Sequence, residues 1–169
     1  MTGLLVRLAD PADFPGVARL TVAAYEADGQ LKGEHGYAAV LADVSTRAAA
    51  GEVLVAVDEA TGSVLGSVTF VLPGTLFAEL SGPGEAEFRM LAVDPAAQGR
   101  GVGVALARAC VDRAAELGCT AVVICVRAGM AVSAHRLYER LGFVRTPEKD
   151  WSPAAGVALL GLRLELSRG

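Results

Sequence analysis

One glycine-dense turn constrains this 169-residue chain more than any other stretch. An apolar, strand-like segment (residues 88–93) ends at Asp94, and a helical pattern begins near Gly101. Glycines at alternate positions, Gly99, Gly101 and Gly103, lack the side chains that would keep a ligand away from the backbone. A helix start there leaves about four amides unpaired and concentrates roughly half a positive charge. The turn therefore predicts an anion site, most simply for a phosphate or pyrophosphate.

Two common glycine-rich motifs do not fit this turn. A dinucleotide-binding turn needs glycine or alanine at its sixth position, and neither Gly99 nor Gly101 has one there. A P-loop needs Gly-Lys-Ser or Gly-Lys-Thr, which the sequence lacks. What remains is Gln98-x-x-Gly101-x-Gly103 after a strand, with a tight turn that binds nothing as the alternative.

Length and charge narrow the class of protein. The chain has the length of one domain, and we expect a single domain over residues 1–169. A net charge of −4 without a basic run does not indicate a nucleic-acid surface. No apolar stretch approaches the ~20 residues of a membrane span. Arg7, Asp10 and Asp13 interrupt any signal-peptide pattern, so we expect a cytoplasmic protein that does not bind membranes.

Cysteine and histidine usage predicts neither a disulfide framework nor a metal site. Cys110, Cys119 and Cys125 are odd in number and lie within apolar patterns, which favours buried, reduced thiols. His35 and His135 are the only histidines, and the sequence has no C-x-x-C pair.

Hydrophobic periodicity predicts the element order β-α-α-β-β-β-α-β-α-β-β. The second helix is expected as one piece over residues 37–50, and residues 147–156 as a loop that holds Trp151. The succession of strand 85–93, helix 101–117 and strand 120–126 predicts a crossover unit with parallel strands. The glycine turn then lies at the carboxyl end of the first strand, where open α/β sheets bind ligands.

A second motif, L-Y-E-R-L-G-F, ends a short helix at residues 137–143. Together with Gln98-x-x-Gly101-x-Gly103, it resembles the two signatures of the GNAT superfamily of N-acetyltransferases. The resemblance covers nearly the whole chain, because both motifs occur in the family's order and element context. It implies an α/β (α+β) GNAT fold. Such a fold has a mostly antiparallel central sheet with one parallel strand-helix-strand unit, flanked by helices.

The resemblance also implies acetyl-CoA as co-substrate, bound where the fourth and fifth strands diverge. The backbone of Leu91 and Val93 would pair with the pantetheine arm, and the amides of residues 99–104 would hold the pyrophosphate. The expected coenzyme-binding residues are Leu91, Ala92, Val93, Gln98, Gly99, Arg100, Gly101, Val102, Gly103 and Val104.

Acetyl transfer to an amine needs a base that removes a proton from the ammonium and an acid that protonates the departing thiolate. By its place in the second motif, Tyr138 is the expected acid. A phenol with a pKa of about 10 can protonate a thiolate whose thiol has a pKa of about 8.5. Because Tyr138 also lies on the apolar stripe of its helix, a place in the core is the alternative reading.

Glu87 is the candidate base. It lies eleven residues before Gln98, an offset similar to that of the general-base glutamate in the histone-acetyltransferase branch. Alternation along the strand predicts one face that holds Glu87, Arg89, Leu91 and Val93 and looks into the acceptor cleft. The alternatives are a strand-end carboxylate paired with Arg89 or solvent, and a water chain as the base.

Two departures from the family pattern matter. Ala131 stands where related enzymes often have an asparagine that contacts the coenzyme or a water. Cys125 stands at about the place where ribosomal-protein N-terminal acetyltransferases use a glutamate, which argues against a mechanism of their type.

The expected function is transfer of acetyl from acetyl-CoA to a primary amine by direct attack in a ternary complex. The alternatives are a non-catalytic acyl-CoA-binding sensor of the same fold and a nucleotide-binding regulator. The acceptor, a small molecule or a peptide, is left open. Its walls would come from the first helix pair, the connection over residues 73–84 and the Trp151 loop. Homodimers are common in the family, and the oligomeric state is also left open.

Overall fold

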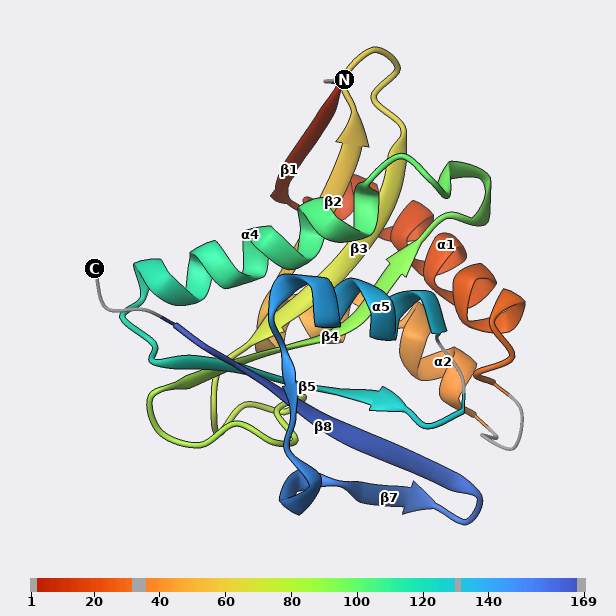
Figure 1. Ribbon diagram of the computed structural model, residues 1–169. Helices are drawn as coiled ribbons and strands as arrows, with labels where there is room; N and C mark the ends of the chain where they lie inside the picture. Colours follow the sequence, from red (N-terminus) through yellow and green to blue (C-terminus); the bar gives the residue numbers. More distant parts are fainter. Residues whose placement is uncertain (1–2, 32–35, 130–131, 167–169) are drawn as a thin grey trace.

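The computed structural model describes residues 3–31, 36–129 and 132–166. Its strands are β1 (Leu4–Leu8), β2 (Glu52–Asp58), β3 (Val64–Val71), β4 (Glu85–Val93), β5 (Ala121–Arg127), β6 (Val144–Arg145), β7 (Trp151–Ala154) and β8 (Val157–Glu165). They form one sheet in the order β1-β2-β3-β4-β5-β8-β6, with β7 paired to β8 (Figure 1). Only the β4–β5 pair is parallel among these pairings. The expected mixed sheet with one parallel unit is thereby confirmed.

Helices cover both faces of this sheet (Figure 1). They are α1 (Phe14–Ala27), α2 (Tyr37–Ala42), α3 (Val44–Ala50), α4 (Val102–Glu116) and α5 (Val132–Leu141). Alternation along β2 separates two packed clusters. Leu54 and Ala56 pack with residues of α4 and α5, whereas Val55 packs on the other face with Val17 of α1 and Val44 of α3. Successive residues of a strand point to opposite faces, so one strand supplies both clusters.

The helix expected over residues 37–50 is in fact two helices that meet at Asp43. The Asp43 side chain accepts a hydrogen bond from the Thr46 amide and caps the start of α3. The buried guanidinium of Arg47 donates to the carbonyls of Val40 and Leu41, at the end of α2. Side chains therefore bind backbone groups at the end of α2 and at the start of α3, which the helices themselves leave unpaired.

The β4 and β5 strands pair only at their beginnings. Their register runs from Glu85 opposite Ala121 to Glu87 opposite Val123. No pairing between the two strands follows among the described residues, so their carboxyl ends separate. This opening lies at the end of β4 that leads into the glycine turn.

A bulge interrupts β4 just beyond that point. Two of its residues, Met90 and Leu91, stand opposite the single residue Val68 of β3. Met90 has φ of 57°, a left-handed conformation that costs a non-glycine residue about 1–2 kcal/mol. A bulge bends its strand and shifts the side-chain alternation by one residue. The continuous face expected from Glu87 to Val93 is therefore broken.

The segment expected as a loop before the last strand is partly ordered into β7. Trp151 stands opposite Leu159 of β8, after a 3₁₀ turn over Pro147–Lys149. Pairing with β8 satisfies backbone groups that a loop would leave to solvent. Within the described residues, no helix combines the length and the apolar character needed to span a membrane.

Candidate active site

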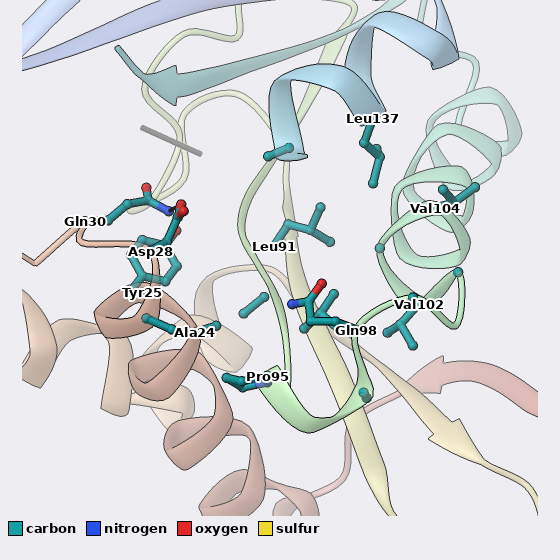
Figure 2. A pocket seen from close by; sticks show the side chains of 18 of the residues that line it. Ala24, Tyr25, Asp28, Gln30, Leu91, Pro95, Gln98, Val102, Val104 and Leu137 are labelled. Carbon is teal, nitrogen blue, oxygen red and sulfur yellow. Dashed lines mark hydrogen bonds between the residues drawn. The ribbon is translucent and has the colours of Figure 1, made fainter. Parts of the chain in front are cut away.

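The glycine turn between β4 and α4 opens onto a cavity of about 470 Å³ (Figure 2). Figure 2 shows Leu91, Gln98 and Val102 on one side of it and Tyr25 and Asp28, at the end of α1, on the other. Of the expected coenzyme-binding residues, those that line this cavity are Leu91, Ala92, Val93, Gln98, Gly99, Gly101, Val102, Gly103 and Val104. Residues far apart in the sequence thus meet around one hollow.

The turn itself has the geometry of an anion site. Gly99 and Gly101 have φ of 83° and 78°, a left-handed conformation that favours glycine. Gly101 precedes α4, and its carbonyl accepts from the amide of Ala105 at 3.0 Å. The amides of residues 102–104 come before this first bond and have no acceptor within the helix. They lie at the positive end of the helix dipole and line the cavity.

Two arginines near the turn, Arg100 and Arg140, are not placed as the motif suggests. Arg100 is absent from the described lining of the cavity, and its guanidinium pairs with Asp58 at 3.2 Å. Its backbone remains part of the turn, but its charge is directed elsewhere. Arg140 of α5 does line the cavity. Arg140 lies in the second motif, and nothing in that motif indicated that it would contact the coenzyme.

A second cavity of about 210 Å³ lies in the opening between β4 and β5. It shares the lining residues Tyr25, Gln30, Leu91 and Ala134 with the first cavity, so the two adjoin. Tyr37 of α2, Glu79 from the connection over residues 73–84, and Pro153 of β7 also line it. The segments expected to wall an acceptor site therefore all reach this cavity, although Pro153 contributes rather than Trp151.

Tyr138 lines the second cavity and is 5% exposed. Its ring packs edge-on against Phe88 and Phe143, each at 5.8 Å between ring centroids. Burial, and then the neighbouring Cys110 and Cys125, raise the pKa of Tyr138. The phenol therefore keeps its proton at neutral pH. This is the protonation state that a proton donor needs, and Tyr138 is at the same time part of the core.

Glu87 does not look into either cavity. It is fully buried, and its carboxylate accepts hydrogen bonds from the backbone amides of Glu79, Leu80 and Ser81 at 3.0–3.2 Å, and from the Ser81 hydroxyl at 3.0 Å. The expected orientation toward the acceptor cleft is thus wrong, because the segment over residues 79–81 covers Glu87 and its backbone amides bind the carboxylate. The alternative, an ion pair between Glu87 and Arg89, is not formed either, because Arg89 pairs with Glu79.

The carboxylate that lines the second cavity belongs to Glu79, not to Glu87. Its Oε1 atom lies 3.1 Å from Arg89 Nε and accepts a hydrogen bond from the Cys125 thiol at 3.5 Å. Burial is the largest single influence and lowers the pKa of Arg89, but Glu79 together with Tyr37, Cys125 and Tyr25 outweighs it, and the pKa is raised. Burial raises the pKa of Cys125 to about 12, so it stays a neutral donor. No local motif marks Glu79, because its contacts join distant segments.

Ala131 and His135 are two further residues that the sequence analysis named. Ala131 lies outside the described residues. His135 approaches the carbonyl of Arg127, with 3.5 Å between Nε2 and the oxygen, which suits a position at the start of a helix. Residues 3–31, 36–129 and 132–166 hold no group of three or more side chains suited to a metal ion.

Comparisons with known proteins show the family of the chain and similar folds. Residues 17–143 match the sequence model of the acetyltransferase (GNAT) family. The structure resembles that of a GCN5-related N-acetyltransferase from Kribbella flavida, with 30% identity, a TM-score of 0.70, and coverage of 97% of this chain and 98% of that one. It also resembles yncA from Salmonella typhimurium, solved with its cofactor acetyl-CoA, at 23% identity and a TM-score of 0.70, covering 99% and 96% of the chains.

A third similar structure is the ribosomal-protein-S18-alanine N-acetyltransferase from Escherichia coli. It has 19% identity and a TM-score of 0.66, over 98% of this chain and 96% of that one. At this identity the likeness concerns the fold alone. No curated protein matches the chain significantly in sequence.

Proposed function

The chain belongs to the acetyltransferase (GNAT) family, and on this premise we propose that it transfers acetyl from acetyl-CoA to a primary amine by direct attack in a ternary complex. The observation that supports this function is the pair of adjoining cavities. One is lined by the unpaired amides of the glycine turn, and the other by a buried, protonated tyrosine. A donor and an acceptor can therefore meet at their junction.

The first cavity suits the coenzyme. The amides of residues 99–104 would hold its pyrophosphate, and Arg140 is a further cation on the same cavity. The backbone of Leu91 and Val93 would pair with the pantetheine arm, because β4 has no partner on its β5 side beyond Glu87 among the described residues. Leu91 lines both cavities, so the thioester would lie at their junction.

The second cavity suits the acceptor and the proton transfers. The ammonium loses one proton before its nitrogen attacks the thioester carbon. The C–N bond forms, the C–S bond breaks, and the nitrogen loses its second proton. Tyr138 donates its proton to the departing thiolate and is reprotonated with the proton that the nitrogen loses. The products are the acetylated amine, the coenzyme thiol and one proton released to solvent.

Free-thiol release from acetyl-CoA across a panel of small amines, amino acids and short peptides tests this function. Release that depends on one class of amine would support it and would narrow the acceptor. Measurable binding of acetyl-CoA without release for any amine would contradict catalysis by this site, and would favour a coenzyme sensor with the same fold. The acceptor class, small molecule or peptide, follows from the same panel.

A further inference from the structure

We propose that Glu79 is the residue that binds the amino group of the acceptor, and that Glu87 positions it from beneath the loop. This inference rests on the proposed acetyl transfer and names the contact that selects a cationic acceptor. The functional carboxylate is thereby assigned to the connection between β3 and β4, and not to strand β4.

The charges around the second cavity single out Glu79. Its charged lining residues, within the described part of the chain, are Glu79, Arg89 and Arg127. Glu79 is thus the one carboxylate among them. An ammonium group that enters a cavity with two guanidinium groups needs an anionic partner close by, because like charges repel. Glu79 is placed to be that partner.

The position of Glu79 suits such a contact. Its side chain is 18% exposed, and Arg89 holds it through Oε1 on the β4 side of the opening. The Cys125 thiol donates to the same oxygen from the β5 side. A carboxylate offers about four lone-pair sites, so binding these two donors does not prevent it from also contacting an ammonium.

Glu87 fixes the segment that presents Glu79. The buried carboxylate of Glu87 accepts the amide of Glu79 itself and the amides of the two residues that follow. Glu85, two residues earlier on β4, accepts the amide of Gly82 at 2.8 Å and so holds the other end of the segment. The strand therefore anchors the backbone on either side of Leu80 and leaves the Glu79 side chain directed into the cavity.

Steady-state kinetics separate these roles, with the panel amine that gives the fastest thiol release as the probe. Glu79→Gln keeps the shape of the side chain and removes its charge. We expect the KM for the amine to rise by about 10- to 100-fold, since a hydrogen bond to a charged group is lost, with the Kd for acetyl-CoA changed less than about twofold. Glu79→Asp should restore part of the affinity. Glu59→Gln, in the turn between β2 and β3, changes an exposed carboxylate that lines neither cavity; it is the matched control and should behave as wild type.

The Glu79→Gln/Glu87→Gln double variant tests the positioning role. If Glu87 acts through Glu79, the amine KM of the double variant should equal that of Glu79→Gln within about twofold. Multiplied effects of the two single variants would overturn that role. If Glu87→Gln does not fold, the Glu79 series still decides the acceptor contact.

The outcomes distinguish this inference from the function on which it rests. Turnover by wild type with an unchanged amine KM in Glu79→Gln would overturn the acceptor contact and leave the acetyltransferase function in place. No turnover by wild type with any amine would overturn both. Turnover by wild type, with an amine KM that is raised in Glu79→Gln and unchanged in the exposed control variant, would support both.

Discussion

Gly66 of β3 lies directly beneath Val102, the first residue of α4. A Cβ atom built on Gly66 would be 2.6 Å from Val102 Cγ1 and 2.9 Å from the carbonyl oxygen of Ala92. The start of the helix therefore rests on a backbone without a side chain. This close contact sets the height of the glycine turn above the sheet, and with it the position of the amides that line the first cavity.

Gly66→Ala should destabilise the fold, because neither the sheet backbone nor the helix start can move away easily. We expect a loss of about 1–3 kcal/mol in the free energy of unfolding, measured by urea denaturation. Gly16→Ala in α1 is the control, because its added Cβ would meet only the flexible end of Arg19 at 3.8 Å. It should instead stabilise the helix by about 0.5–1 kcal/mol. Equal effects of the two substitutions would refute the packing argument.

Gly101→Ala should weaken the binding of acetyl-CoA. The position has φ of 78° with open space around it, so the added methyl group costs only backbone strain, about 1–2 kcal/mol. Gly156→Ala, in the β7–β8 turn, introduces the same strain at the same φ of 78°. Both variants should lose similar stability in thermal melts. Calorimetric titration with acetyl-CoA should show a lower affinity for Gly101→Ala only, and a shared loss would remove the turn from the binding site.

Tyr138→Phe should lower kcat by about 100-fold, which is typical of losing a general acid. The ring packing against Phe88 and Phe143 is kept, so the Kd for acetyl-CoA and the melting temperature should change little. Thiol-release kinetics together with a binding titration test this. An unchanged kcat would leave Tyr138 with a role in the core only.

Because of Asp150, the stability of the C-terminal strands should fall at acidic pH. Its side-chain hydrogen bonds with Arg145, at 2.7 and 2.8 Å, and the amide of Gly161 lower its pKa to about 2 in the folded protein. The unfolded value is about 3.9, so the stability that Asp150 contributes is present above about pH 4 and is lost as the pH falls toward 2.

Urea midpoints of wild type and Asp150→Asn over this range test the prediction. The difference between the two proteins should be largest near neutral pH and should shrink as the pH falls from about 4 through 2. A difference that stays constant with pH would show that the Asp150 ion pair is not what the substitution removes.

The sequence determined the parts of the fold that depend on neighbouring residues. The glycine turn, the start of α4 at Val102 and the strand-helix-strand unit follow from patterns only a few positions long. Hydrophobic alternation and periodicity likewise indicated most strands and helices. The same local motifs indicated the family, because both signatures lie within single turns or helices. For these elements, backbone geometry and side-chain type are coupled over short distances.

The tertiary structure decided whatever depends on residues distant in sequence. Arg47 ends α2 and packs on Thr69 of the sheet, which divides a helix that periodicity alone predicts as one. The bulge at Met90 becomes visible only in the register against β3. The backbone amides of residues 79–81 bind the Glu87 carboxylate away from the cavity, and the Glu79 side chain enters that cavity beside Cys125, 46 residues away in the sequence. Such contacts form only when the sheet assembles, so no local pattern predicts which carboxylate faces the acceptor.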